Sequence, residues 1–154
     1  MSNTQNSSSD VQQTAEKELL ANFEAKHKVQ KSSFVFSDGF PVKIDGIYEN
    51  VDGKLLLVEA YAHQGPLKSA QTHKICTDML KLITAQKLLF SRHKEADLWI
   101  LLACEEAEKH FKGKSWHSFV VKHFGINIEV GKLSPQMVEK IKQAQLRQKM
   151  VNAK

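Results

Sequence analysis

Apolar residues recur at two spacings along the chain, and the change from one spacing to the other predicts where helices give way to strands. From about Val11 to Val29 the apolar positions follow the 3.6-residue period of a helix. Residues 32–62 instead hold short apolar or alternating stretches separated by turn residues, which predicts three strands, FVF, VKIDGIY and LLLVEAYA. The ENVDGK stretch between the last two is typical of a hairpin loop.

The second half of the chain predicts one long helix, a buried strand, two short helices, another strand and a last helix. The long helix runs from about Leu67 to Phe90, with Pro66 near its first turn, where a missing N–H costs nothing. EADLWILLAC is an apolar run of the kind buried on both faces of a sheet, and a glycine interrupts the helical pattern of EEAEKHFKGKSWHSFVVKHFG. INIEV follows as a short strand, and Ser134 with Pro135 marks the start of the last helix. The order αβββαβααβα predicts one α/β domain with a mixed sheet flanked by helices.

The overall charge narrows the classes of partner. The net charge is +5 at pH 7, which favours polyanionic partners, with nucleic acid first among them. The two cysteines form no CxxC pair and no disulfide framework, so a reduced, cytoplasmic setting fits best. No apolar run approaches the roughly 18 residues that span a bilayer, so we expect no membrane partner.

Composition also divides the chain into three segments. Residues 1–12 are rich in Ser, Asn and Gln, which is typical of a disordered leader. Residues 13–133 carry the expected domain. Residues 134–154 form a basic amphipathic helix that can present charge to a nucleic-acid backbone.

Two carboxylates stand in strands that are otherwise apolar, Asp45 in VKIDGIY and Glu59 in LLLVEAYA. The short turn between these strands predicts antiparallel neighbours, which would bring the two carboxylates close enough to share one cation. Such oxygen ligands suit Mg²⁺ or Mn²⁺, which use only one or two protein carboxylates and keep several waters. The alternative places Asp45 in an Asp-Gly turn and Glu59 at a solvated strand end.

The helix after the second carboxylate carries a polar stripe beside its core positions. Gln71, Lys74 and Asp78 fall within about 60° of one another at 100° per residue, next to Ile75 and Met79. A solvated helix face would place its polar residues opposite the apolar ones. The stripe therefore favours a site at the junction between strand and helix.

These residues carry a family resemblance. The segment DGIYENVDGKLLLVEAYAHQGPLKSAQTHKICTDMLKL and the αβββαβ order of about residues 11–104 resemble the PD-(D/E)XK superfamily, whose fold is restriction-endonuclease-like. More narrowly, the segment is similar to a bacterial subgroup with an Asp-Gly strand, a Glu-x-aromatic-Ala-His-x-Gly stretch and Lys, Gln, Lys and Asp on the helix. The resemblance implies a metal-dependent nuclease that hydrolyses phosphodiester bonds in DNA or RNA. A homodimer is a further expectation, because many enzymes of this superfamily cut duplexes as dimers.

The resemblance also implies a set of metal ligands. Asp45 and Glu59, with the carbonyl of Ala60, would hold Mg²⁺ or Mn²⁺. The first helix of the superfamily often adds a glutamate near the metal. Glu16 matches that position best, with Glu18 as the other candidate, and a surface helix charge is the alternative for both.

The main departure from the family concerns its catalytic lysine, which normally stands two residues after the glutamate. Tyr61 occupies that position here. We expect the lysine to come from the next helix, with Lys74 as the replacement and Lys68 and Gln71 in supporting roles. An ordinary solvated helix lysine is the alternative for Lys74.

Four residues are expected to contact nucleic acid: Lys68, His63, Lys114 and Trp116. The last two lie in KGKSWHS, where a basic loop with an aromatic ring can stack on a base and hold phosphates. The alternatives are a structural histidine and a tryptophan that anchors a helix start. A second hypothesis for the whole chain keeps the fold without the chemistry, as a catalytically inactive nucleic-acid-binding or protein-interaction module, with Tyr61 marking the lost lysine.

Overall fold

The computed structural model describes residues 8–36, 39–41 and 43–153. Within them, five strands form one open mixed sheet with the order β1-β2-β3-β4-β5. β1 to β3 are antiparallel neighbours, whereas β3, β4 and β5 run parallel. The elements are α1 (Ser8–His27), β1 (Gln30–Lys31), β2 (Gly46–Glu49), β3 (Leu55–Tyr61), α2 (Ser69–Phe90), β4 (Ala96–Leu102), α3 (Glu105–Lys112), α4 (Trp116–Phe124), β5 (Asn127–Val130) and α5 (Pro135–Asn152).

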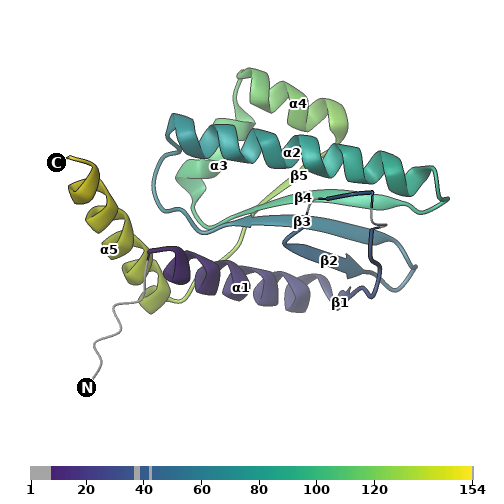
Figure 1. Ribbon diagram of the computed structural model, residues 1–154, viewed down its shortest axis with the longest axis horizontal. Coiled ribbons are helices and arrows are strands. Elements are labelled where there is room, and N and C mark those ends of the chain that lie inside the picture. The colour runs from purple at the N-terminus through teal and green to yellow at the C-terminus, as the bar shows by residue number, and fades with distance from the viewer. Residues whose placement is uncertain (1–7, 37–38, 42, 154) are drawn as a thin grey trace.

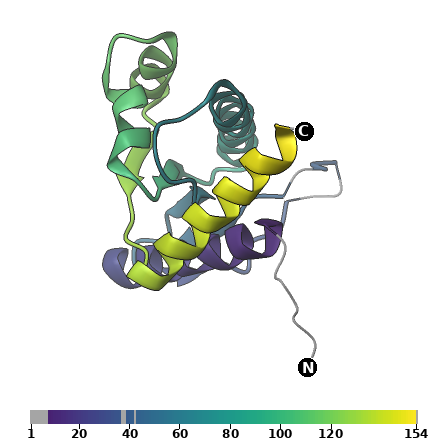
Figure 2. The same cartoon turned by 90° about the vertical axis from the view of Figure 1, so that its left-hand side faces the viewer.

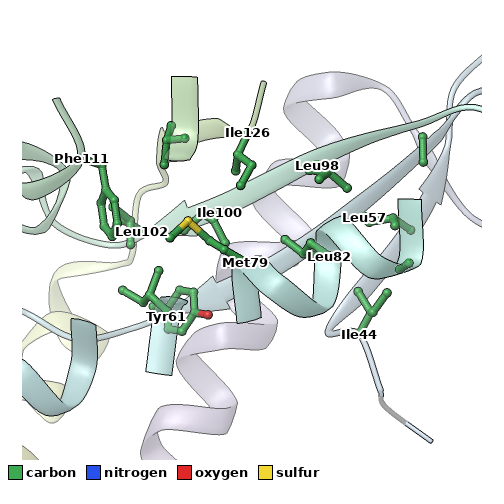
Figure 3. Packing of buried hydrophobic residues seen from close by; sticks show 14 of the residues in the cluster. Ile44, Leu57, Tyr61, Met79, Leu82, Leu98, Ile100, Leu102, Phe111 and Ile126 are labelled. Atoms are coloured by element: carbon green, nitrogen blue, oxygen red, sulfur yellow. The ribbon is translucent and has the colours of Figure 1, made fainter. Parts of the chain in front are cut away.

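Helices cover both faces of the sheet, with α1 and α5 on one side and α2, α3 and α4 on the other (Figure 1). The strand β3 is buried along its whole length and supplies alternate residues to the two cores. Leu57 and Tyr61 face α2, where Met79 and Leu82 pack against them (Figure 3), while Val58 faces α1. The same alternation turns Glu59, between Leu57 and Tyr61, towards the α2 side.

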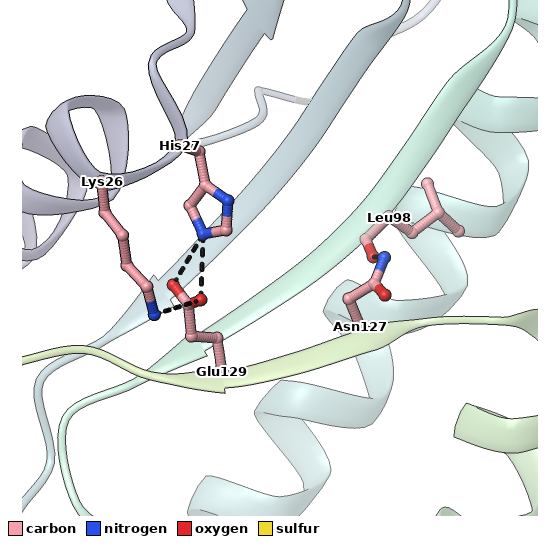
Figure 4. Close-up of polar contacts among 5 residues, drawn as sticks. All are labelled: Lys26, His27, Leu98, Asn127 and Glu129. Atoms are coloured by element: carbon pink, nitrogen blue, oxygen red, sulfur yellow. Dashed lines mark hydrogen bonds and ion pairs between the residues drawn. The ribbon is translucent and has the colours of Figure 1, made fainter. Parts of the chain in front are cut away.

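A polar cluster fixes the C-terminal end of α1 to the far edge of the sheet. Glu129 of β5 accepts hydrogen bonds from Lys26 Nζ and His27 Nε2, each at 2.9 Å (Figure 4). On the same strand, the Asn127 side chain donates to the Leu98 carbonyl at 3.1 Å. The contacts of Glu129 tie α1 to the sheet, and that of Asn127 joins β5 to β4.

The order of elements predicted from the sequence is confirmed, with five helices and five strands in the expected succession within the described residues. Ser134 caps α5, because its hydroxyl accepts a hydrogen bond from Met137 N at 3.3 Å, and Pro135 is the first helical residue. Gly113 separates α3 from α4, as the glycine break predicted. No helix among the described residues is long and apolar enough to cross a membrane.

Two strand predictions were wrong. The first strand is Gln30–Lys31, not FVF, because Phe34 and Phe36 pack against each other (ring centroids 5.3 Å apart) and against the α2-side core instead of entering the ladder. The second strand starts at Gly46, so most of VKIDGIY precedes it. The ladder ends at Asp45, because the Asp45 side chain accepts the hydrogen bond from Ala60 N. In a continuing antiparallel ladder, a backbone carbonyl of the neighbouring strand would accept that bond.

Helix starts also differ from the sequence expectation. α2 begins at Ser69, two residues later than expected, and Pro66 precedes the helix. α1 begins at Ser8, three residues before Val11, which is buried on the sheet side of the helix. Of the expected leader, residues 1–7 lie outside the described part of the chain.

Candidate functional site

Asp45 and Glu59 lie next to each other at the end of the β2–β3 ladder. The last paired residues there are Gly46 and Val58, so one step further along the antiparallel register places Asp45 opposite Glu59. Asp45 Oδ2 accepts a hydrogen bond from Ala60 N at 3.0 Å. Glu59 is only 2% exposed, whereas Asp45 is exposed. The predicted carboxylate pair is therefore present, with one member buried and the other open to solvent.

The environment of Glu59 disfavours its negative charge. Burial raises its pKa, and the hydrogen bond and charge of Asp45 raise it further, while Lys81 opposes them; the pKa is about 8. Two adjacent carboxyl groups of this kind hold a proton or a cation between them. The pair is thus a cation-seeking group at neutral pH.

The lysine that reaches Glu59 is Lys81, in the fourth turn of α2. Its ammonium lies 2.5 Å from Glu59 Oε1 and 3.3 Å from Asp78 Oδ1, and it donates to the Lys43 carbonyl at 2.9 Å. Burial lowers the pKa of Lys81, but the hydrogen bond and charge of Glu59 together with Asp78 outweigh it, so that the pKa is raised. Lys81 therefore carries its charge at the buried carboxylate.

Tyr61, where the resemblance led us to expect a lysine, belongs to the same network. Its hydroxyl donates to Asp78 Oδ2, and the other oxygen of Asp78 faces Lys81. Burial and this hydrogen bond raise the pKa of Tyr61, so the phenol stays protonated and keeps donating. A continuous chain of contacts therefore runs from Tyr61 through Asp78 and Lys81 to Glu59.

The expected replacement, Lys74, lies two turns nearer the start of α2 than Lys81. Its ammonium lies 5.8 Å from the centre of the Tyr61 ring, in cation–π geometry. Gln71 Oε1 accepts from Lys68 N at 2.8 Å, so the glutamine side chain caps the first turn of the helix. The structure thus places these three residues at the entrance of the site and Lys81 at its buried carboxylate.

The two glutamates proposed on α1 have different surroundings. Burial and the charges of Asp45 and Asp78 raise the pKa of Glu16 to about 7, although Lys74 lowers it. Glu18 points elsewhere, since its Oε1 accepts from Ser134 N at 2.7 Å and so fixes the start of α5. Glu16 is therefore the α1 glutamate that faces the carboxylate pair.

The residues expected to contact nucleic acid fall into two groups. His63 and Lys68 line a groove beside the site, and His63 Nε2 lies 3.3 Å from the Pro66 carbonyl. Burial lowers the pKa of His63, so it is neutral at pH 7. Lys114 and Trp116 lie in and after the α3–α4 connection and do not line that groove. The Trp116 ring is 71% exposed and stacks on a neighbouring helix aromatic, 5.6 Å away.

The donor set suits a small, hard cation. Among the described residues, no group of three or more His, Cys, Asp or Glu side chains is arranged to hold a metal ion. Mg²⁺ needs only one or two carboxylates besides water, and Asp45 and Glu59 supply two. Within the described chain, Glu59 Oε1 has no hydrogen-bond partner apart from its ion pair with Lys81, so a cation would meet an acceptor with spare capacity.

Comparisons with protein-family models, with curated proteins and with solved structures found no match for this chain.

Proposed function

We propose that the chain is a metal-dependent nuclease that hydrolyses phosphodiester bonds in nucleic acid at Asp45, Glu59 and Lys81. The observation that carries the proposal is the meeting of two carboxylates from neighbouring strands with a charged lysine from the following helix. Burial of Glu59 together with Lys81 costs free energy that a purely structural role does not require. An arrangement of this kind is common at catalytic sites, where perturbed pKa values gather.

The architecture supports the same reading. Helix α1, three antiparallel strands, helix α2 and the parallel strand β4 follow one another in the order of a restriction-endonuclease-like core. In such a core the metal ligands come from the second and third strands. Asp45 directly precedes β2 and Glu59 lies in β3, which supports the proposal that they are the metal ligands.

The metal expected at this site is Mg²⁺ or Mn²⁺, held by Asp45, Glu59 and the carbonyl of Ala60, with Glu16 near by. When bound, it supplies the Lewis acidity that lets water attack a phosphodiester at neutral pH and stabilises the departing oxyanion. Asp45 is exposed and can meet a phosphate-rich ligand from solvent. Glu59 gives up its proton on binding and keeps the Lys81 ammonium at its other side.

Lys81 takes the part of the lysine that the family places two residues after the glutamate. Its ammonium can donate to an attacking water or to a phosphate oxygen while Asp78 holds it in position. Tyr61 in turn fixes Asp78. The tyrosine that replaces the strand lysine is thus a positioning residue for the helix lysine.

A cleavage assay with labelled DNA and RNA in Mg²⁺ or Mn²⁺ tests the proposal. Asp45→Ala and Lys81→Met should each lower the rate at least a hundredfold, because they remove a metal ligand and the only ammonium at Glu59 among the described residues. Lys87→Met, at the other end of the same helix, is the matched control. Parent-like cleavage by Asp45→Ala would overturn the proposal.

A second candidate function is a nucleic-acid-binding or protein-interaction module without catalysis. The raised pKa of Glu59 favours it, because a carboxyl that keeps its proton at pH 7 needs no metal. Calorimetric titration with Mn²⁺ separates the two candidates. A site that is present in the parent and absent from Glu59→Gln supports the nuclease, and nucleic-acid binding with no metal site supports the module.

A further inference from the structure

A groove leads from solvent to the network around Tyr61. It has an inner chamber of about 240 Å³ and an outer one of about 600 Å³, which share Gln12, His63, Ala70, Gln71 and Gln148 and are therefore continuous. The inner chamber ends at Tyr61 and Glu16, beside the carboxylates. The walls come from the start of α1, the start of α2 and the end of α5 (Figure 2).

The lining is basic and rich in amides. Lys68 and Lys149 line the outer chamber and Lys74 the inner one, while Glu16 is the one acidic residue in either lining. The remaining polar lining includes the side-chain amides of Gln12, Gln64, Gln71, Gln145, Gln148 and Asn152. Lysines bind phosphates, and amides can donate to and accept from base edges. The chemistry of the groove is that of a nucleotide strand.

Gln145 holds α5, which forms one wall of the groove, in place. Gln145 Oε1 accepts from Gln64 N at 2.9 Å, and Gln145 Nε2 donates to the Gln64 carbonyl at 3.0 Å. The Gln64 side chain in turn donates to the Ala103 carbonyl at 3.1 Å. These bonds fix α5 to the loop after β3, so that Gln148 and Lys149, one turn further, face Lys68 across the groove.

The spacing of the lysines fits an extended strand. Lys68, the residue before α2, and Lys74 are six residues apart, which is about 9 Å along the helix axis, enough for two neighbouring phosphates. Three helix ends and the loop of residues 62–67 line the groove. Unpaired bases can enter such a space with their hydrogen-bonding edges free, whereas a duplex keeps those edges paired.

We infer that this groove binds single-stranded nucleic acid, with Lys68 and Lys149 holding phosphates and the side-chain amides of Gln12, Gln148 and Asn152 facing the bases. The inference rests on the proposed function in one respect, since it makes the groove the path along which a strand reaches the carboxylates. It names the substrate class as a single strand, or an unpaired stretch within a duplex.

Fluorescence anisotropy in EDTA, on the Asp45→Ala background, tests the inference without cleavage or metal. The probes are a 12-nucleotide single strand, as DNA and as RNA, and the duplex of the same sequence. The double variant Lys68→Ala/Lys149→Ala is compared with Lys87→Ala/Lys140→Ala. The control pair lies on the same two helices, with Lys87 about 28 Å from Lys68 along α2 and both control lysines outside the groove lining.

The single strand should bind more tightly than the duplex. Loss of two phosphate contacts should weaken it roughly 14-fold at 0.15 M salt and reduce the slope of log K against log salt by about 1.4, at about 0.7 per contact. Gln148→Glu, which places a negative charge where the chambers meet, should weaken binding without removing a lysine. The control pair should change the affinity less than threefold.

Equal weakening by the control pair, or equal binding of duplex and single strand, would overturn the inference. Competition by poly-glutamate as strong as that by the unlabelled strand would also overturn it and would point to an acidic peptide. These outcomes are independent of cleavage. If Asp45→Ala cut nucleic acid as well as the parent, the proposed function would fail while the binding result stood.

Discussion

Removal of the Lys81 ammonium is the sharpest perturbation of the site. Lys81→Met keeps an unbranched side chain and removes the ammonium with its contacts to Glu59, Asp78 and the Lys43 carbonyl. The side chains of Lys81 and Glu59 are 13% and 3% exposed, so water can replace little of what the ammonium supplies. The variant leaves a buried carboxyl beside Asp45 with no charge partner among the described residues.

The expected cost is about 3 kcal/mol of unfolding free energy at pH 7. Loss of the hydrogen bond to the Lys43 carbonyl accounts for about 1 kcal/mol. Loss of the partner of buried Glu59 accounts for about 2 kcal/mol. That is below the roughly 3–5 kcal/mol of a fully ionised buried pair, because Glu59, with a pKa of about 8, already holds a proton at pH 7.

The loss of unfolding free energy in Lys81→Met, relative to the parent, should grow as the pH rises above 8. The pKa of Glu59 is about 8 in the parent and higher without Lys81. Below pH 8 both folded proteins hold the proton, so the deficit is constant. Above pH 8 only the variant holds it, so its stability falls relative to the parent by up to about 1.4 kcal/mol per pH unit.

Urea unfolding at pH 7 and pH 9 measures both quantities, with Lys87→Met as the control. The double variant Glu59→Gln/Lys81→Met should recover most of the loss, giving a coupling energy of about 2 kcal/mol in the mutant cycle. A cost below 1 kcal/mol, or no added deficit at pH 9, would refute the assignment of Lys81 as the partner of Glu59.

Three further predictions concern the neighbours of this pair. Mn²⁺ affinity should rise about tenfold per pH unit between pH 6 and 8, because Glu59, with a pKa of about 8, must lose its proton; a flat calorimetric profile would contradict this. Tyr61→Phe removes the hydrogen bond to Asp78 and should cost about 2 kcal/mol and lower kcat more than it changes KM, since Lys81 loses its support; unchanged stability would count against the network. Glu16→Gln should gain stability over the parent as pH rises from 4.5 to 7, by at most about 3 kcal/mol, because the raised pKa of Glu16 makes its ionisation costly in the folded state. Unfolding curves at pH 4.5 and 8.5 check this last difference, and an equal gap at both would contradict it.

Much of the fold could be predicted because local signals agreed with one another. The order of helices and strands followed from periodicity, and Ser134 with Pro135 marked a helix start that the structure confirms. The prediction of a strand at FVF failed because three apolar residues cannot show whether the backbone joins a sheet or only the rings pack against the core. In the structure, the rings of Phe34 and Phe36 pack against the core, and their backbone does not join the sheet.

The pairing of Asp45 with Glu59 could also be predicted from the sequence, because a short hairpin fixes which residues lie opposite each other. The lysine that contacts Glu59 could not be predicted, because it depends on which turn of the helix lies over the strand. Lys81 follows Lys74 by seven residues and so shares its face of α2, which is the signal that could have found it. Lys81 lies 12 residues, or about 18 Å, from the start of the helix. The loop between β3 and α2 sets where the helix begins, so that its fourth turn, and not its first, lies over Glu59.

The attachment of α5 has a consequence for how a strand could enter. Of its described residues only Ile141 and Ala144 are buried, and Gln145 joins its second half to the β3–α2 loop by two hydrogen bonds. An element with so little buried apolar surface opens at a lower free energy than the central strands, so its amides should exchange with solvent faster than those of β3. The helix that walls the groove should therefore open before the central strands do. If the groove binds a strand, such opening would admit the middle of an intact strand from the side, so that no free end has to be threaded.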